Sequence, residues 1–125
     1  MQLPRQSAVL SRHWLGKDWF DDPGDHADEL ETSVMMHYHP ELVNLAEAGQ
    51  GRANAFALQS LREKTAWMPR HWNRVSEDTG IGNPSLATAE KGRRFAEAVA
   101  QKYALLLKEL AAVNDEQDFY EKVKN

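Results

Sequence analysis

The chain has 125 residues, of which 42% are hydrophobic and 27% charged, and its formal net charge is −4. This length suffices for one modest domain and is too short for two, and the composition is that of a folded protein rather than a disordered one. The acidic balance argues against a nucleic-acid surface, which needs concentrated Lys and Arg. The absence of cysteine excludes disulfides, thiolate nucleophiles and Cys-based zinc sites.

The start of the chain gives no sign of export or membrane insertion. Met1–Ser7 lacks the apolar core of a secretion signal, and no apolar stretch approaches the length needed to span a membrane. We therefore expect a cytoplasmic protein that interacts with neither a membrane nor nucleic acid.

The first third of the chain predicts one helix. Ser7–Leu10 is compatible with a short strand, and Phe20–Gly24 is typical of a turn because it contains Pro and Gly. Acidic residues followed by apolar residues near helical spacing predict a helix over Asp28–His39. Pro40 is expected to end this helix because it has no N–H to donate.

The middle of the chain is expected to hold the few strands. Ala55–Leu58 and Lys64–Met68 are candidate strands, although the first is equally compatible with a helix because Ala and Leu favour helices. Arg70–Pro84 is rich in polar residues and glycine, which predicts an extended loop. Loops of this length in a compact domain are usually functional or mobile.

The last third predicts a long amphipathic helix. Apolar residues recur every three or four positions from Gly92 to Val113, which places them on one stripe of a helix over Ser85–Ala112. A short terminal helix is predicted at Glu116–Val123.

The segment Asp25–Ser33 holds the strongest chemical pattern, because it packs one imidazole and four carboxylates into nine residues. An imidazole exchanges protons near neutral pH, and a nearby carboxylate can orient it or hold a metal. His26 is therefore the first candidate for a catalytic side chain, and Glu31 for its partner. Because these two residues would not share a face of a straight helix, a turn near Asp28 would have to bring them together.

The same segment resembles the H-A-G-E-x-E-T-S signature of the creatininase (creatinine amidohydrolase) family, with Asp28 at the position of the signature's Gly. Val34–Val43 is similar to the family's continuation, an apolar helix that ends in Pro-Glu-Leu-Val. Thr79–Pro84 and then Ala87–Gly92 are similar to its late loop-to-helix segment. The resemblance spans about residues 18–110, and it implies the C-terminal half of such an enzyme.

The resemblance implies an α/β fold, as part of a three-layer α/β/α domain that is helix-rich in this segment with a few short strands. We expect a single partial domain over residues 1–125, with 1–17 poorly defined. The implied function is metal-dependent hydrolysis of a non-peptide C–N bond in a small cyclic or linear amide. The implied cofactor is a divalent zinc, manganese or iron ion, and the implied assembly is a homo-oligomer, which is a hexamer in the family.

The resemblance also assigns roles to individual residues. It carries a catalytic role onto His26, and it makes Glu31 a partner of His26 or of the metal site. Glu29 and Asp28 are candidates for contacting the substrate or supporting these residues, although Glu29 could equally be a helix-start carboxylate stabilised by the helix dipole. A family Gly at position 28 suggests a close backbone approach or an unusual φ, which Asp tolerates less well.

The family's metal ligands come from segments that this chain lacks: an E-x-H-G segment, an Asp shortly after it, and an N-G-H-G-G-N-like segment. No residue of this chain is therefore assigned as a metal ligand. His37 and His39 lie two positions apart on the predicted helix, so their side chains point in different directions. The alternative function is a non-catalytic fragment or subunit that pairs with a partner chain carrying the metal-binding half.

Overall fold

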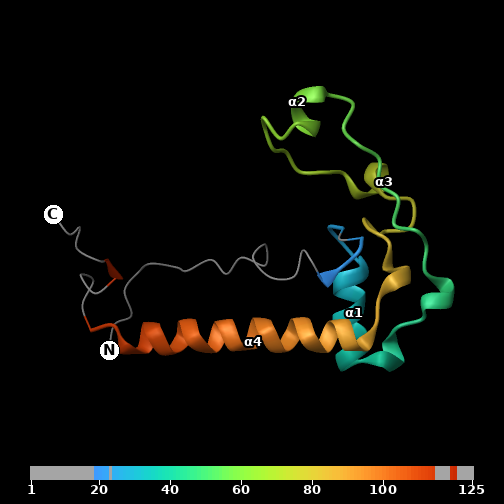
Figure 1. Cartoon of the computed structure of the whole chain (residues 1–125). Coiled ribbons are helices and arrows are strands. Elements are labelled where there is room, and N and C mark those ends of the chain that lie inside the picture. Colours follow the sequence, from blue (N-terminus) through green and yellow to red (C-terminus); the bar gives the residue numbers. More distant parts are fainter. Residues whose placement is uncertain (1–18, 23, 115–118, 121–125) are drawn as a thin grey trace.

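The structure is a computed structural model that describes residues 19–22, 24–114 and 119–120 (Figure 1). Its elements, in chain order, are α1 (Glu29–Tyr38), the 3₁₀ turns η3 (Pro40–Leu42) and η4 (Leu45–Glu47), α2 (Gln59–Arg62), α3 (Trp72–Val75), the 3₁₀ turn η5 (Pro84–Leu86) and α4 (Ala89–Ala112). Residues 1–17, with the strand predicted at Ser7–Leu10, lie outside the described residues, and so does most of the predicted helix Glu116–Val123.

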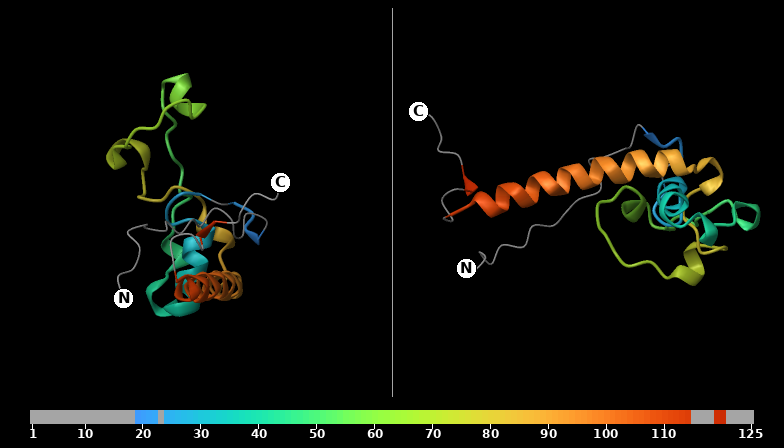
Figure 2. Two further views of the ribbon diagram at one scale, coloured as in Figure 1. Left: turned by 90° about the vertical axis from the view of Figure 1, so that its left-hand side faces the viewer. Right: turned by 90° about the horizontal axis from the view of Figure 1, so that it is seen from below.

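Helices α1 and α4 form the main packing contact between elements, and α1 lies across the N-terminal part of α4 (Figures 1 and 2). Gly92 of α4 lies directly against Ser33 of α1, where a Cβ atom on Gly92 would collide with the Ser33 backbone carbonyl. The missing side chain at position 92 therefore allows the two helices to approach closely.

The long helix predicted near the end of the chain is confirmed, but it begins later than expected. Thr88 caps α4, because its hydroxyl accepts the Lys91 N–H at 3.2 Å. The first residues of the predicted helix belong instead to η5, where the Asn83 carboxamide accepts the Ser85 N–H at 2.9 Å and starts a separate turn. None of the helices in the described part of the chain is both long and apolar enough to cross a membrane.

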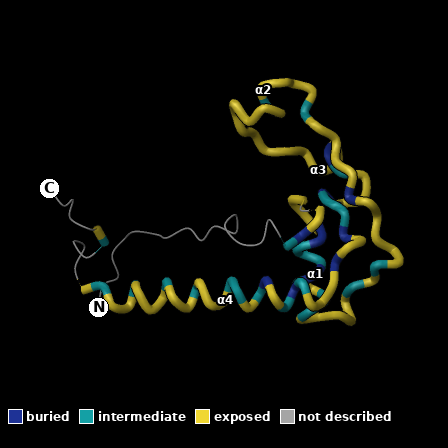
Figure 3. The backbone as a smooth tube through the Cα atoms, in the orientation of Figure 1, coloured by how far each residue is buried: buried dark blue, intermediate teal, exposed yellow. Residues whose placement is uncertain are grey.

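The core lies where α1, the start of α4 and the segment before α1 meet (Figure 3). The rings of Phe20 and Phe95 pack edge to face, with centroids 5.8 Å apart and planes at 73°. The buried apolar residues of the described chain include Phe20, Val75, Ile81, Ala87 and Phe95. The C-terminal part of α4 extends beyond this core, and Leu105 and Leu107 on it are exposed.

Residues 52–74 form an arm that leaves the two packed helices and returns to them, with α2 far from the helices and α3 near them (Figure 1). The base of the arm is closed by an antiparallel bridge between Ala53 and Ser76. The Asn54 N–H also donates to the Val75 carbonyl at 2.7 Å. Because Val75 is buried, this base is anchored in the core although the rest of the arm is largely exposed.

The prediction of strands at Ala55–Leu58 and Lys64–Met68 is wrong, because both segments lie in the arm and neither has strand structure. A strand needs a neighbouring strand to pair with, and β-type pairing in the described part of the chain is limited to two isolated bridges. The Arg62 guanidinium instead donates to two carbonyls of the first segment at 2.7 Å. The loop predicted over Arg70–Pro84 is also interrupted by α3. The described residues are thus helix-rich, and they do not show the expected three-layer arrangement.

Replacing Gly92 with Ala tests the contact between α1 and α4. Overpacking costs about 1–3 kcal/mol, which we expect to exceed the gain of about 1 kcal/mol in helix propensity, so the free energy of unfolding should fall. Urea titration followed by circular dichroism measures this change. The control is Gln101→Ala at an exposed position of the same helix, which should keep or raise stability. A Gly92→Ala protein as stable as the control would contradict the close approach.

Candidate functional site

His26 is held in place by backbone pairing with Ile81. The His26 N–H donates to the Ile81 carbonyl at 3.1 Å, and the Ile81 N–H donates to the His26 carbonyl at 2.8 Å. Directly after it, Ala27 has φ = 48°, in the left-handed region that residues other than glycine seldom adopt. This turn reverses the chain between the bridge and the start of α1.

The turn brings His26 and Glu31 together, as their proposed partnership requires. Glu31 Oε2 accepts the Ala27 N–H at 2.8 Å and lies 3.6 Å from His26 Nδ1. That distance is compatible with an ion pair and longer than a hydrogen bond. The carboxylate is therefore anchored by the turn itself and faces one nitrogen of the imidazole. The His26 side chain is 51% exposed, so it is accessible to a small molecule.

Two cavities flank this pair. One, of about 460 Å³, is lined by His26, Trp72, Asn73, Ser76, Glu77 and Thr79. The other, of about 450 Å³, has Glu31, Ala27, Gly80 and Thr79 among its lining residues. Thr79 borders both cavities and has φ = 70°, which is unusual for a β-branched residue. The imidazole of His26 and the carboxylate of Glu31 thus line different cavities, and Thr79, with its unusual φ, lines both.

Asp28 caps α1, and the unusual φ suggested for position 28 is not found there. Its φ is −80°, and the positive φ lies one residue earlier, at Ala27. The two oxygens of Asp28 accept the Glu31 N–H at 2.9 Å and the Gly24 N–H at 2.7 Å. The carboxylate of this buried residue is therefore occupied by the cap and by the preceding turn.

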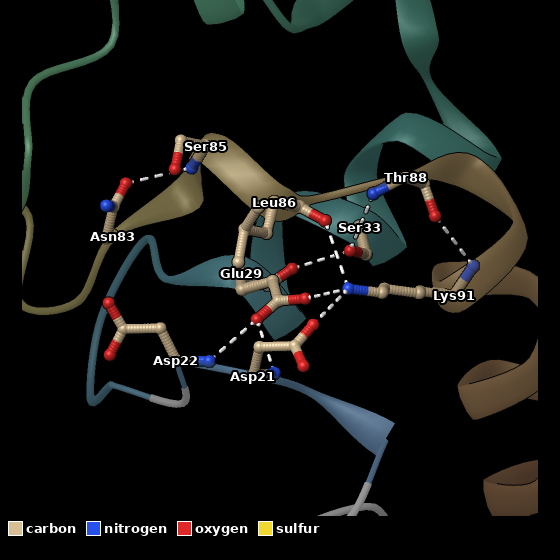
Figure 4. A network of polar contacts seen from close by, with 9 residues as sticks. All are labelled: Asp21, Asp22, Glu29, Ser33, Asn83, Ser85, Leu86, Thr88 and Lys91. Carbon is tan, nitrogen blue, oxygen red and sulfur yellow. Dashed lines mark hydrogen bonds and ion pairs between the residues drawn. The ribbon is translucent and has the colours of Figure 1, made fainter.

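Glu29 is fully buried, with a relative exposure of 0%, so it offers no surface to a substrate. Its Oε2 accepts the N–H groups of Asp21 and Asp22 at 2.8 and 2.9 Å, and its Oε1 is ion-paired with Lys91 (Figure 4). The Ser33 hydroxyl donates to the Glu29 carbonyl at 2.6 Å. The structure therefore places Glu29 in a buried polar network that joins α1 to α4.

Lys91 and Ser33, for which the sequence predicted no role at the site, complete this network. Lys91 Nζ also pairs with Asp21 at 3.0 Å and donates to the Leu86 carbonyl at 3.2 Å. The carboxylates of Glu29 and then Asp21 raise the pKa of Lys91 above its ordinary value. Ser33 Oγ accepts the Thr88 N–H at 3.1 Å. One feature of the sequence could have drawn attention to Lys91 and Ser33: both lie inside the segments that carry the family resemblance.

These two segments are part of a longer match. The chain matches the creatininase family, described as creatinine amidohydrolase, over residues 5–107. The chain belongs to the creatininase family. This confirms the resemblance found in the sequence.

A solved structure also resembles this creatininase-family chain. It is the crystal structure named "Putative creatinine amidohydrolase from Bacteroides fragilis NCTC 9343", with 53% sequence identity and a TM-score of 0.77. The likeness covers 86% of this chain and 41% of that chain. The chain therefore spans less than half the length of this relative. No curated protein matches the chain.

The described residues of this creatininase-family chain do not form a metal site by themselves. Among residues 19–22, 24–114 and 119–120, no group of three or more His, Asp or Glu side chains is arranged to hold a metal ion. His39 instead lies 3.3 Å from Glu41 in an exposed pair after α1, and the ring of His37 packs against Tyr38. The described residues therefore do not fit the divalent metal that the family implies.

Asp78 lines the cavity beside Glu31 and binds the backbone of two neighbouring segments. Its carboxylate accepts the Gly51 N–H at 3.1 Å and the Gly80 N–H at 3.0 Å. These two hydrogen bonds hold the pKa of Asp78 below its usual value of 3.8. The charged form of Asp78 thus ties the segment after η4 to the segment that pairs with His26.

Replacing Glu29 with Gln tests the buried network. The variant keeps the volume and an oxygen acceptor but loses the charge that pairs with Lys91, so stability should fall. The matched control is Glu97→Gln, which removes an exposed carboxylate paired with Arg93. Exposed ion pairs contribute little to the free energy of unfolding, whereas breaking a buried pair lowers it strongly. We therefore expect Glu29→Gln to lose several times more stability than Glu97→Gln. Equal denaturation midpoints for the two variants would contradict this assignment.

Asp78 predicts a specific pH dependence. Its folded pKa is lowered, so its contribution to stability is present above the unfolded pKa of about 3.9 and is lost as the pH falls through the folded value. Asp78→Asn should therefore destabilise the protein at pH 7, and its difference from the wild type should shrink below about pH 4. Urea titrations at pH 7 and pH 3 measure this, with the exposed Glu109→Gln as control. An undiminished difference at pH 3 would refute it.

Proposed function

We propose that this chain contributes the proton-transfer site of an amidohydrolase that cleaves a non-peptide C–N bond in a small cyclic or linear amide. Family membership supports an amidohydrolase. The single observation that carries the choice of site is the pairing of His26 with Glu31 beside a cavity. The reaction itself, its substrate and its metal are parts of the proposal, because the chain spans only 41% of its relative.

In this proposal His26 is the general acid and base. Cleavage of an amide C–N bond leaves a nitrogen that departs poorly unless it receives a proton, and an imidazole suits this transfer near neutral pH. The Glu31 carboxylate faces Nδ1 at 3.6 Å, and its role in this proposal is to orient the imidazole. The second ring nitrogen, Nε2, then exchanges the proton with the substrate.

The backbone around the pair supports its geometry. The bridge to Ile81 fixes the main chain of His26, and the Ala27 N–H fixes the Glu31 carboxylate. The imidazole and its partner are thus positioned by one turn, so a small displacement of that turn would misplace both. A misplacement of about 1 Å can cost a factor of about 100 in rate.

A divalent zinc, manganese or iron ion belongs to the proposal only through the family. The creatininase family is generally metal-dependent, and the described residues contain no group of three or more His, Asp or Glu side chains that could hold a metal ion. We therefore assign this chain the binding and protonation of the substrate at His26, and we assign no metal ligand among its described residues.

Replacing His26 with Gln tests the proposal. The substitution should lower kcat by about 10²–10⁴-fold, the usual contribution of a general acid or base. Glu31→Gln should lower it by about 10–100-fold, because a supporting partner is lost. Activity is measured with manganese or zinc in the buffer, against creatinine and a panel of lactams and linear amides.

The control is His39→Gln, which removes an exposed His whose Nδ1 lies 3.3 Å from Glu41, away from both cavities. This variant should keep wild-type activity. Retention of full activity by His26→Gln would remove that residue from the mechanism. A wild-type protein that hydrolyses none of these amides, with or without metal, would contradict the proposed function as a whole.

A further inference from the structure

Glu31 constrains His26 on one side only. The carboxylate lies 3.6 Å from Nδ1, too far for a hydrogen bond, and half of the His26 side chain is exposed. An ion pair at this distance does not by itself prevent an imidazole from rotating about its side-chain torsions. A proton donor that must meet a departing nitrogen needs a second constraint on the plane of its ring.

Trp72 lies where such a constraint is needed. It is the first residue of α3, and its ring centroid lies 5.1 Å from that of His26, with the two planes at 60°. The two residues are 46 positions apart in sequence, so this contact exists only because the arm returns to the helices. An indole supplies a large, rigid contact surface that loses little conformational entropy when it packs.

Arg70 links Trp72 back to the residue before His26. Its guanidinium carbon lies 5.9 Å from the centroid of the Trp72 ring, a cation–π distance. The same guanidinium is ion-paired with the carboxylate of Asp25. The backbone N–H of Asp25 donates to the Ile81 carbonyl at 2.6 Å. A chain of contacts therefore links Asp25, which directly precedes His26, to Arg70 and then to Trp72. Trp72 in turn packs against the His26 ring.

The C-terminal end of α3 is anchored in the core, so the segment that carries Arg70 and Trp72 is held at that end. Val75 of α3 is buried, and the Asn54 carboxamide donates to the Arg74 carbonyl at 2.9 Å. Trp72 itself remains 49% exposed. A large aromatic ring that is half exposed, beside a cavity and in contact with an imidazole contributes little to the core, which points to a role at the site.

We propose that Trp72, held by Arg70, is a positioning residue that fixes the ring orientation of His26 opposite Glu31. This rests on the proposed function of His26. Trp72 then acts on the rate of proton transfer rather than on substrate affinity. Trp72→Phe would keep a flat aromatic face against the imidazole, whereas Trp72→Ala would remove it.

The experiment compares Trp72→Ala, Trp72→Phe and Arg70→Met in the full chain by steady-state kinetics and by NMR of the histidine ring protons. The His26 signal is assigned by its loss in His26→Gln. We expect Trp72→Ala to lower kcat by about 10–100-fold with little change in KM, and Trp72→Phe to restore most of it. Arg70→Met should lower kcat less. The His26 ring-proton shifts should move in Trp72→Ala, because the ring current of the indole is lost.

The matched control is Trp67→Ala, which removes a Trp of the same arm that is 85% exposed. It should change neither kcat nor the His26 shifts. An unchanged kcat in Trp72→Ala would overturn the proposal, as would a rise in KM alone or a failure of Trp72→Phe to restore the rate. Unmoved His26 shifts in Trp72→Ala would also overturn it. Since the NMR measurement needs no turnover, it tests the contact even if the proposed hydrolysis fails.

Discussion

The fully buried carboxylate of Glu29 is the constraint on which the rest of the structure depends. An isolated buried charge is very costly, so Glu29 requires its partners: the ammonium of Lys91 and the N–H groups of Asp21 and Asp22. These partners come from α4 and from the segment before α1. Satisfying one carboxylate therefore joins three parts of the chain at the first residue of α1 (Figure 4).

The start of α1 in turn decides what its other carboxylates do. Asp28, at the cap, accepts backbone N–H groups on both sides of the helix start. Glu31, three residues later, reaches back over the turn at Ala27 and faces the imidazole of His26. Three acidic residues of similar chemistry thus have three distinct roles: a cap, a buried ion pair and a partner for an imidazole. Only the last is exposed to a cavity.

The arm places two further side chains next to the candidate site. Its two ends are tied together near α3, and its return brings an indole and a guanidinium to His26. By contrast, the C-terminal part of α4 continues past the core with leucines exposed. The site therefore lies in the part of the described chain where several segments converge, although that part holds few buried apolar side chains.

The sequence by itself determined α1, most of α4 and the family, because helical periodicity and capping residues are local and the signature is contiguous. It made His26 and Glu31 the first candidates for the site. It also indicated that a turn must join His26 to Glu31. Only the tertiary structure decided that Glu29 is buried with Lys91, and that Ala55–Leu58 and Lys64–Met68 form no strands. Those outcomes depend on partners distant in sequence: a carboxylate is buried only if a cation reaches it, and a strand forms only beside another strand. The packing of Trp72 against His26 required the fold for the same reason.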